Sequence, residues 1–215
     1  MTYLQLVNNV MRRLRENEVS TVNENAYSKL IGEYVNDAKR TVEDAWDWTA
    51  LRSTITLTTS DSSYNYTLTD SQNRFKVLNV INQTSNAFMT YRGSNSMDKA
   101  YLVDTAPEGT PTYYTFKGVD ASGDNKVDLY PKPDGVYSID FNVVLRTADF
   151  TADAQTLAIP PSAVIQLATA LSARERGETG GTSAAELFAL ADTTLADAIA
   201  IDASYHPEET IWNVV

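Results

Sequence analysis

The apolar residues in the first quarter of the chain repeat with the spacing of α-helices. From about Thr2 to Asn17 they fall three or four positions apart, which aligns them as one stripe along a helix. The same rhythm continues for about five turns between Tyr27 and Trp46. Thr21 and Glu24 have the spacing of a capping box, which predicts where this second helix begins. Its other face is predicted to be solvated, because it carries Lys29, Glu33, Asp37, Lys39, Arg40, Glu43 and Asp44.

From Leu51 the period of the pattern changes to two, which is typical of β-strands. Ile55 and Leu57 alternate with threonines, and a second alternating segment, 64–68, follows the short turn 61–63. Further strand-like segments are 75–81, 87–92, 111–118, 126–131 and 136–145. The connections between them, including 93–98, have the composition of turns. This spacing predicts an antiparallel, sandwich-like or barrel-like β module over residues 51–146.

Helical spacing returns after the β module. Pro160 and Pro161 suit the first turn of a helix, where a missing N–H has no cost, and this helix is predicted to end near Gly177. The pair Gly180–Gly181 is predicted to be a link, and Ser183–Glu186 has the spacing of a second capping box. We therefore expect an α+β protein, in which residues 1–50 and 147–215 form a four-helix core and the β module is inserted between them.

The amino-acid composition and the net charge of the chain exclude several classes of function. The 215 residues include no cysteine, so disulfides, thiolate metal sites and thiol nucleophiles are excluded. The net charge of −11 argues against binding of nucleic acid, although an acidic surface would repel DNA and let it pass. No apolar run approaches the length of a membrane span, and the N-terminus lacks the pattern of a signal peptide. We expect no contact with a membrane.

No catalytic set is visible in the sequence. The only histidine, His206, stands before Pro207, and neither G-x-S-x-G nor a phosphate-binding glycine motif occurs. The segment 120–128 offers oxygens at alternate positions, but Asn125 replaces the glycine of a calcium loop and Pro131 replaces its final glutamate. A hairpin turn is the better interpretation. We expect no enzyme, metal or cofactor; a carboxylate pair acting on cell-wall glycan stays a minor alternative.

Trp46 and Trp48 stand where the helical period gives way to the strand period. Two positions that are two residues apart point about 200° apart on a helix, so one face cannot hold both rings. We expect the helix to end near Asp47, with Trp46 in the helical core and Trp48 under the first strand. The pair is thus predicted to be a structural joint between the helical core and the β module.

The C-terminal tail, residues 205–215, is too short for an element of its own. Its apolar residues follow the acidic Glu208 and Glu209. They are predicted either to fold back onto the helical core or to dock onto a neighbouring subunit or a partner by strand addition. These interaction residues are Ile211, Trp212, Val214 and Val215.

The order of these elements resembles that of phage head-to-tail adaptor (connector) proteins, of the tail tubular protein A type found in short-tailed phages. The matching pieces are the first helix, YLQLVNNVMRRLRE, and the long helix that closes on Trp46-Asp-Trp48. Three shorter pieces follow in the same order, namely Leu129–Pro133, Ile159–Pro161 and Ala173–Gly177. The resemblance covers nearly the whole chain in element order, and the β module matches least well.

The resemblance implies a structural virion protein without enzymatic activity. Such adaptors are made in the host cytoplasm and form a ring, usually of twelve copies, at the portal vertex. Their helical part lies beside the portal protein, their β part reaches toward the tail nozzle or tube, and the C-terminal arm often engages the portal. The genome passes through the ring without specific binding. An alternative comes from the residues themselves: eight of the twelve tyrosines lie between Tyr64 and Tyr137 and favour a carbohydrate- or peptide-binding module of a phage tail.

Overall fold

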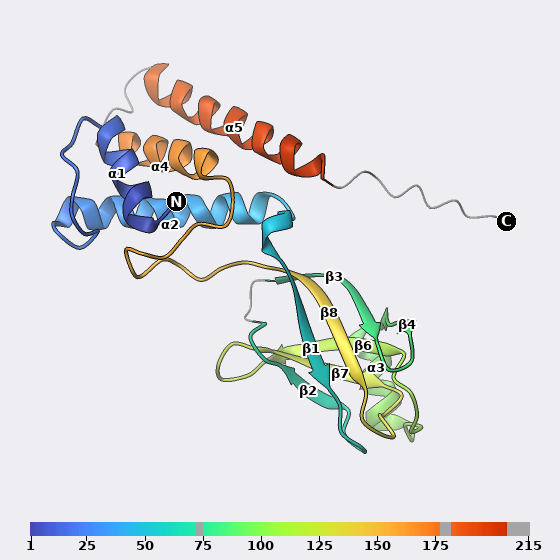
Figure 1. The fold of residues 1–215 in the computed structure, drawn as a ribbon. Helices are drawn as coiled ribbons and strands as arrows, with labels where there is room; N and C mark the ends of the chain where they lie inside the picture. The colour runs from blue at the N-terminus through green and yellow to red at the C-terminus, as the bar shows by residue number, and fades with distance from the viewer. Residues whose placement is uncertain (72–74, 177–181, 206–215) are drawn as a thin grey trace. The chain divides into compact units, whose positions relative to one another are not determined.

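The computed structural model describes residues 1–71, 75–176 and 182–205, with the side chains of 182–184 left aside. The chain divides into two compact units. The helical unit combines Met1–Leu51 with Arg146–Val215, and the β unit is the continuous segment Arg52–Leu145. The protein is of the α+β class, with helices and two sheets (Figure 1).

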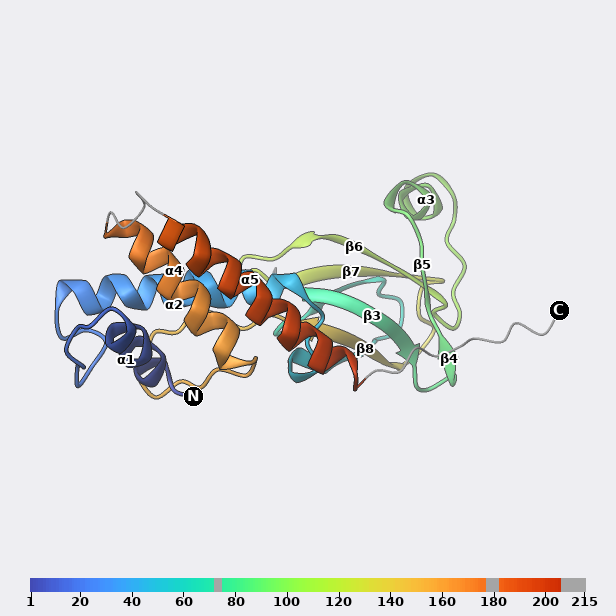
Figure 2. The same cartoon turned by 90° about the horizontal axis from the view of Figure 1, so that it is seen from above.

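The helical unit is organised around one helix from its C-terminal part. This helix, α4 (Pro161–Glu175), contacts the three other long helices of the unit, and α1 also contacts α2. Figure 2 shows α4 and α5 crossing above α2. The three other helices are α1 (Tyr3–Arg13), α2 (Ala26–Ala45) and α5 (Thr182–Ala203). Val7 and Val10 of α1 are fully buried, as the apolar stripe predicts, and Leu6, outside that stripe, is fully buried as well.

The starts of the helices follow from local capping. Thr2 and Gln5 form a capping box at α1, in which each side chain accepts from the other residue's backbone N–H. The box predicted at Thr21 and Glu24 is wrong: α2 begins one turn later with a box of Asn25 and Ser28. Glu24 instead accepts hydrogen bonds from the backbone N–H and the hydroxyl of Ser20, which holds the preceding turn.

Prolines start α4 as predicted, while the first helix ends earlier than expected. Pro160 is the N-cap residue of α4 and Pro161 its first helical residue. α1 ends at Arg13 rather than near Asn17, because Arg15 takes a left-handed conformation with φ of 59°. The predicted link 180–181 lies outside the described residues, and the side chain of Ser183, the expected cap, is not described.

The β unit consists of two four-stranded sheets that share an apolar core. The first sheet has the order β1 (Arg52–Thr58), β8 (Ser138–Leu145), β3 (Phe75–Asn82), β4 (Ala87–Phe88). The second has the order β2 (Asn65–Leu68), β7 (Asn125–Tyr130), β6 (Tyr113–Val119), β5 (Thr90–Tyr91). Only β5 and β6 pair in parallel among the pairs within these sheets.

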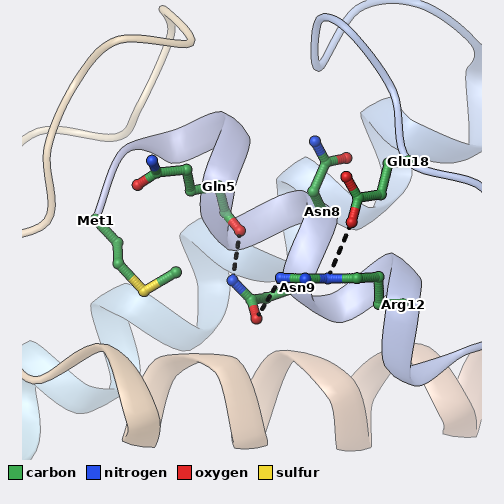
Figure 3. Close-up of a pocket in the computed structure, with 6 residues that line it drawn as sticks. All are labelled: Met1, Gln5, Asn8, Asn9, Arg12 and Glu18. Atoms are coloured by element: carbon green, nitrogen blue, oxygen red, sulfur yellow. Dashed lines mark hydrogen bonds and ion pairs between the residues drawn. The ribbon is translucent and has the colours of Figure 1, made fainter.

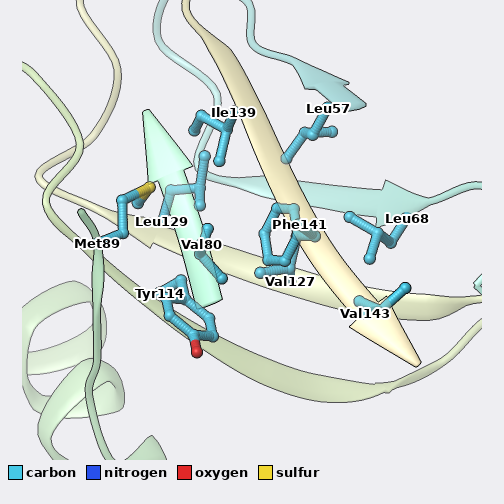
Figure 4. Close-up of a cluster of buried hydrophobic side chains, with 10 residues drawn as sticks. All are labelled: Leu57, Leu68, Val80, Met89, Tyr114, Val127, Leu129, Ile139, Phe141 and Val143. Atoms are coloured by element: carbon cyan, nitrogen blue, oxygen red, sulfur yellow. The ribbon is translucent and has the colours of Figure 1, made fainter. Parts of the chain in front are cut away.

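The core of the β unit lies between these sheets (Figure 4). Val127 and Leu129 of β7 and Ile139 and Phe141 of β8 are each 0% exposed. Alternate residues of each strand thus point into the space between the sheets, where β7 of one sheet faces β8 of the other, as the period of two predicts. The sheets do not close into a barrel, so the sandwich alternative describes this unit and the barrel alternative does not.

Two connections in the β unit differ from the sequence prediction. Segment 61–63 does not close a hairpin, because β1 pairs with β8 while β2 pairs with β7 in the other sheet. The turn expected at 93–98 contains a short helix, α3 (Ser94–Asp98), and a π-helical turn, η2 (Lys99–Val103), follows it directly. Met97 and Ala100 are buried there, and burial of these two side chains accounts for ordered structure in a turn-like sequence.

Candidate functional site

Residues 120–124 form the turn of the β6–β7 hairpin, as predicted, and residues 125–128 belong to β7. Asp120 Oδ1 accepts hydrogen bonds from the backbone N–H groups of Ser122 and Asp124 at 2.8 and 3.0 Å. Gly123 has a φ of 88°, a conformation that glycine adopts readily. The Asp120 oxygen therefore serves the turn. Across residues 1–71, 75–176 and 182–205, no group of three or more His, Cys, Asp or Glu side chains is arranged to hold a metal ion.

The other candidate features of the sequence fall outside the described residues or give no site. His206 and the tail residues Ile211, Trp212, Val214 and Val215 lie beyond residue 205, where the description ends. None of the helices in the described ranges is long and apolar enough to cross a membrane.

The tryptophan pair is anchored in the helical unit by its indole N–H groups. Helix α2 ends at Ala45, two residues before the expected position, because Trp46 is already extended with φ of −150° and ψ of 158°. Trp48 is the fully buried ring, and it donates a hydrogen bond to the carbonyl oxygen of Val42 at 2.7 Å. Trp46 is half-buried and donates to Asp202 at 3.0 Å. The structure thus gives the buried position to Trp48 rather than to Trp46.

Asp202, near the end of α5, accepts hydrogen bonds from the segment that follows α2. Besides the Trp46 indole, its Oδ2 accepts hydrogen bonds from the backbone N–H and the hydroxyl of Thr49 at 3.1 and 3.2 Å. The residue is 9% exposed. Three donors around one buried carboxylate stabilise its negative charge. Sequence reasoning missed this residue, because an aspartate in a helix without periodic polarity gives no sign of its partners.

A second polar cluster surrounds Lys39 and Glu43, whose side chains are each 1% exposed. The Lys39 Nζ lies 3.2 Å from Glu43 Oε1 and donates to the carbonyl oxygens of Thr147 and Ala148. The hydroxyl of Thr147 donates to Glu43 at 2.6 Å. Nearby, Asn36 exchanges two hydrogen bonds with the backbone of Phe150. The prediction of a solvated face was wrong at Lys39 and Glu43, because segment 147–150 covers this part of α2.

The outer face of α1 carries an open groove of about 390 Å³ (Figure 3). It is lined by Met1, Gln5, Asn8, Asn9, Arg12 and Glu18. Arg12 lies 3.1 Å from Glu18 and donates to the Asn9 side chain, whose amide donates to the carbonyl oxygen of Gln5. The groove offers amides, the Arg12 guanidinium and the Glu18 carboxylate, and these last two groups form an ion pair. Its chemistry is that of a polar contact surface.

A basic region continues from this groove to the end of α4. A cavity of about 440 Å³ there is lined by Arg13, Leu14, Arg15, Glu16 and Arg176. Arg176 donates to the carbonyl oxygen of Leu14 at 2.9 Å and lies 3.1 Å from Glu16. Arg13 donates to Gln166, a neutral partner. In a chain with a net charge of −11, this is a local concentration of positive charge.

The tyrosines of the β unit pack mainly against one another. Tyr64 and Tyr101 are stacked with ring centroids 4.0 Å apart, and the guanidinium of Arg92 lies 4.6 Å from the centre of the Tyr130 ring. Burial raises the pKa of Tyr101 above its ordinary value, and its hydroxyl donates to the carbonyl oxygen of Leu129. These rings therefore serve the packing of the unit, while Tyr91 remains 57% exposed.

Comparison with known proteins gives one family. The family model described as SU10 adaptor protein matches residues 1–210 of the chain. No curated protein matches it. The family match agrees with the resemblance to phage head-to-tail adaptors that the order of elements indicated.

Proposed function

We propose that the chain, which belongs to the SU10 adaptor family, forms a ring that joins the portal protein to the tail nozzle or tube. The family is one of phage structural adaptors, so the chain is a structural protein of the virion that acts with other head or tail components. The family match over residues 1–210 is the observation that carries this proposal. We propose a ring of twelve copies at the portal vertex, with DNA passing through its channel.

The charge of the chain supports a channel that does not hold DNA. With a net charge of −11 per copy, a ring would carry a large negative charge, which disfavours the binding of phosphates. A DNA-binding protein would instead need basic residues to release counterions from the backbone. Passage without specific binding is therefore the proposed relation to DNA.

Assembly with the cognate portal protein tests the proposal. The adaptor is mixed with purified portal rings, and the mixture is examined by co-sedimentation and negative-stain electron microscopy. We expect the adaptor to add a second ring layer to the portal. An adaptor that remains monomeric in the presence of its cognate portal protein would contradict the proposal.

For the architecture, we propose that the helices of 1–50 and 147–215 act as one four-helix core that carries the β module 51–146. The contacts of α4 with α1, α2 and α5 support it. Trp46 and Trp48 are the proposed joint. Trp48→Ala should lower the free energy of unfolding by about 3–5 kcal/mol, since a fully buried ring is lost. A loss below about 1 kcal/mol in urea denaturation would contradict this role.

We further propose that the tail docks onto the portal or a neighbouring copy through Ile211, Trp212, Val214 and Val215. A variant that ends at Tyr205 distinguishes docking from folding back. Docking predicts an unchanged melting temperature and a loss of co-sedimentation with the portal. A lower melting temperature with intact co-sedimentation would show that the tail covers its own core.

A second candidate function is a carbohydrate- or peptide-binding module of the tail. The exposed rings of Tyr91 and Tyr113, at 57% and 39%, favour it. Tyrosine fluorescence during titration with host glycans tests this candidate function. An unchanged signal of the wild-type protein would exclude glycan binding.

A further inference from the structure

The outer face of α5 is poorly suited to remain in water. Its exposed positions include two large aliphatic residues, Leu190 at 48% and Ile201 at 62%. Around them stand the exposed residues Ala185, Glu186, Ala189, Asp192, Ala196, Asp197 and Ala200. Helix α5 contains four acids and no lysine or arginine. A helix with apolar residues on several sides is normally covered on those sides.

The outer face of α1 has the opposite character. Helix α1 contains no acid, and Arg12 and Arg13 are exposed in its last turn. Gln5, Asn8 and Asn9 line its groove with amides, which donate hydrogen bonds well to carboxylates (Figure 3). The ion pair of Arg12 with Glu18 joins side chains that are 58% and 54% exposed. Such a pair contributes little, so Arg12 is able to exchange partners.

The two faces are complementary to each other but not to themselves. Two α5 faces together would oppose Glu186, Asp192 and Asp197 to the same acids. Two α1 faces would bring Arg12 and Arg13 against the same arginines, with Glu18 as the one acid that lines the groove. An α5 face against an α1 face pairs acids with arginines and amides. Because the faces lie on different helices, this contact joins each copy to the next in a head-to-tail manner. Contacts of this kind close into rings when the rotation allows.

We propose that the outer face of α5 in one copy docks onto the groove face of α1 in the next copy of this chain. The inference rests on the proposed ring and names the surfaces that hold it together. Glu186 and Asp197 meet Arg12 and Arg13 of the neighbour, while Leu190 and Ile201 are removed from water. The occupant of the α5 face is thus a second copy of the same protein.

Cysteine cross-linking tests the contact directly, because the chain has no cysteine of its own. Asn9→Cys places one thiol in the α1 groove, and Thr193→Cys places one on the exposed side of α5 that also carries Glu186 and Asp197. In portal-bound rings under mild oxidation, the double variant should give a ladder of covalent oligomers, and a mixture of the two single variants should give dimers. Each single variant alone should stay monomeric on a denaturing gel. Dimers from one single variant would overturn the head-to-tail contact.

Charge reversal tests the electrostatic part. E186R with D197R, or R12E with R13E, should weaken ring assembly at least about tenfold, because like charges then face each other. All four changes in one chain should restore assembly. The control for E186R with D197R is D61R with D104R, two exposed acids of the β unit with the same change in net charge. Circular dichroism checks that each variant is folded.

The outcomes separate this inference from the proposed function. Rings on the portal without a ladder, and without an effect of the reversals, would overturn the α1–α5 contact and leave the adaptor ring intact. Absence of any assembly with the portal would overturn both. A ladder together with rescue by the fourfold reversal supports the contact.

Discussion

The helical unit and the β unit hold their chain segments together in different ways. In the β unit, buried acids bond to neighbouring strands that already share a ladder: Asp140 accepts from Thr56 and Gln83, and Asp128 accepts from Asn65. In the helical unit, Lys39 and Asp202 join pieces of chain that are 108 and 156 residues apart and share no ladder.

This difference has a physical reason. A sheet sets the register of its strands by backbone hydrogen bonds, so its core can be apolar and still be specific. Helices satisfy their backbone groups internally, and helix packing alone permits sliding and rotation. A unit made of two distant chain pieces therefore gains a defined register from buried polar contacts, as coiled coils do from a single buried polar residue.

The largest expected effect concerns the apolar core of the β unit. Phe141→Ala should lower the free energy of unfolding by about 3–5 kcal/mol, because it leaves a cavity between the sheets. Urea denaturation followed by circular dichroism measures it. Phe88→Ala, at a ring that is 72% exposed, is the control and should change stability by about 0.5 kcal/mol or less. Equal losses in both variants would contradict an apolar basis for this unit.

In the helical unit, Lys39→Ala should cost about 3 kcal/mol. The change removes the ammonium group that lies 3.2 Å from the buried Glu43 carboxylate and donates to the carbonyl oxygens of Thr147 and Ala148. Lys29→Ala, on an exposed position of the same helix, is the matched control. The double variant K39M/E43L should recover most of the loss, since both buried charges are gone. No recovery would indicate that the bonds to segment 147–148 matter more than the charge.

Asp202→Ala should have a smaller effect, about 2 kcal/mol. Its removal leaves the indole N–H of Trp46 and the backbone N–H of Thr49 without their acceptor. The thermal unfolding temperature and the emission maximum of tryptophan report the change. Asp197→Ala, five residues earlier on the exposed side of α5, should leave both unchanged. A similar shift in the two variants would refute a specific role of Asp202.

The last effect concerns Tyr3 and is present only at alkaline pH. Burial, together with Asp153, Glu33 and Asp149, raises the pKa of Tyr3 to about 12, above the value of about 10 for an unfolded tyrosine. The folded chain keeps this proton where the unfolded chain loses it, so stability falls as pH rises from about 10 to 12. Tyr3→Phe should make this fall shallower in denaturation measured at several pH values. Tyr205→Phe, at an exposed ring, should not.

Much of the fold could be predicted from periodicity, because each local pattern agrees with burial in the final structure. The strand patterns of 126–131 and 136–145 correspond to β7 and β8, and the double proline to the start of α4. Pairing was less predictable: Ile55 and Leu57 of β1 face Phe141 and Ile139 of β8, more than eighty residues away, instead of the next strand. A turn sequence such as 61–63 serves a hairpin and a crossing between sheets equally well.

For the candidate surfaces too, some properties follow from the sequence and others only from the tertiary structure. The sequence by itself determined the α+β class, the family resemblance, the absence of cysteine and the charge of each helix, since these depend on composition and local spacing. Only the tertiary structure decided that Lys39 is buried, that Trp48 rather than Trp46 is the enclosed ring, and that α5 turns Leu190 and Ile201 outward. Burial and partnership depend on which distant segment covers a residue, and no local pattern in this chain encodes that choice.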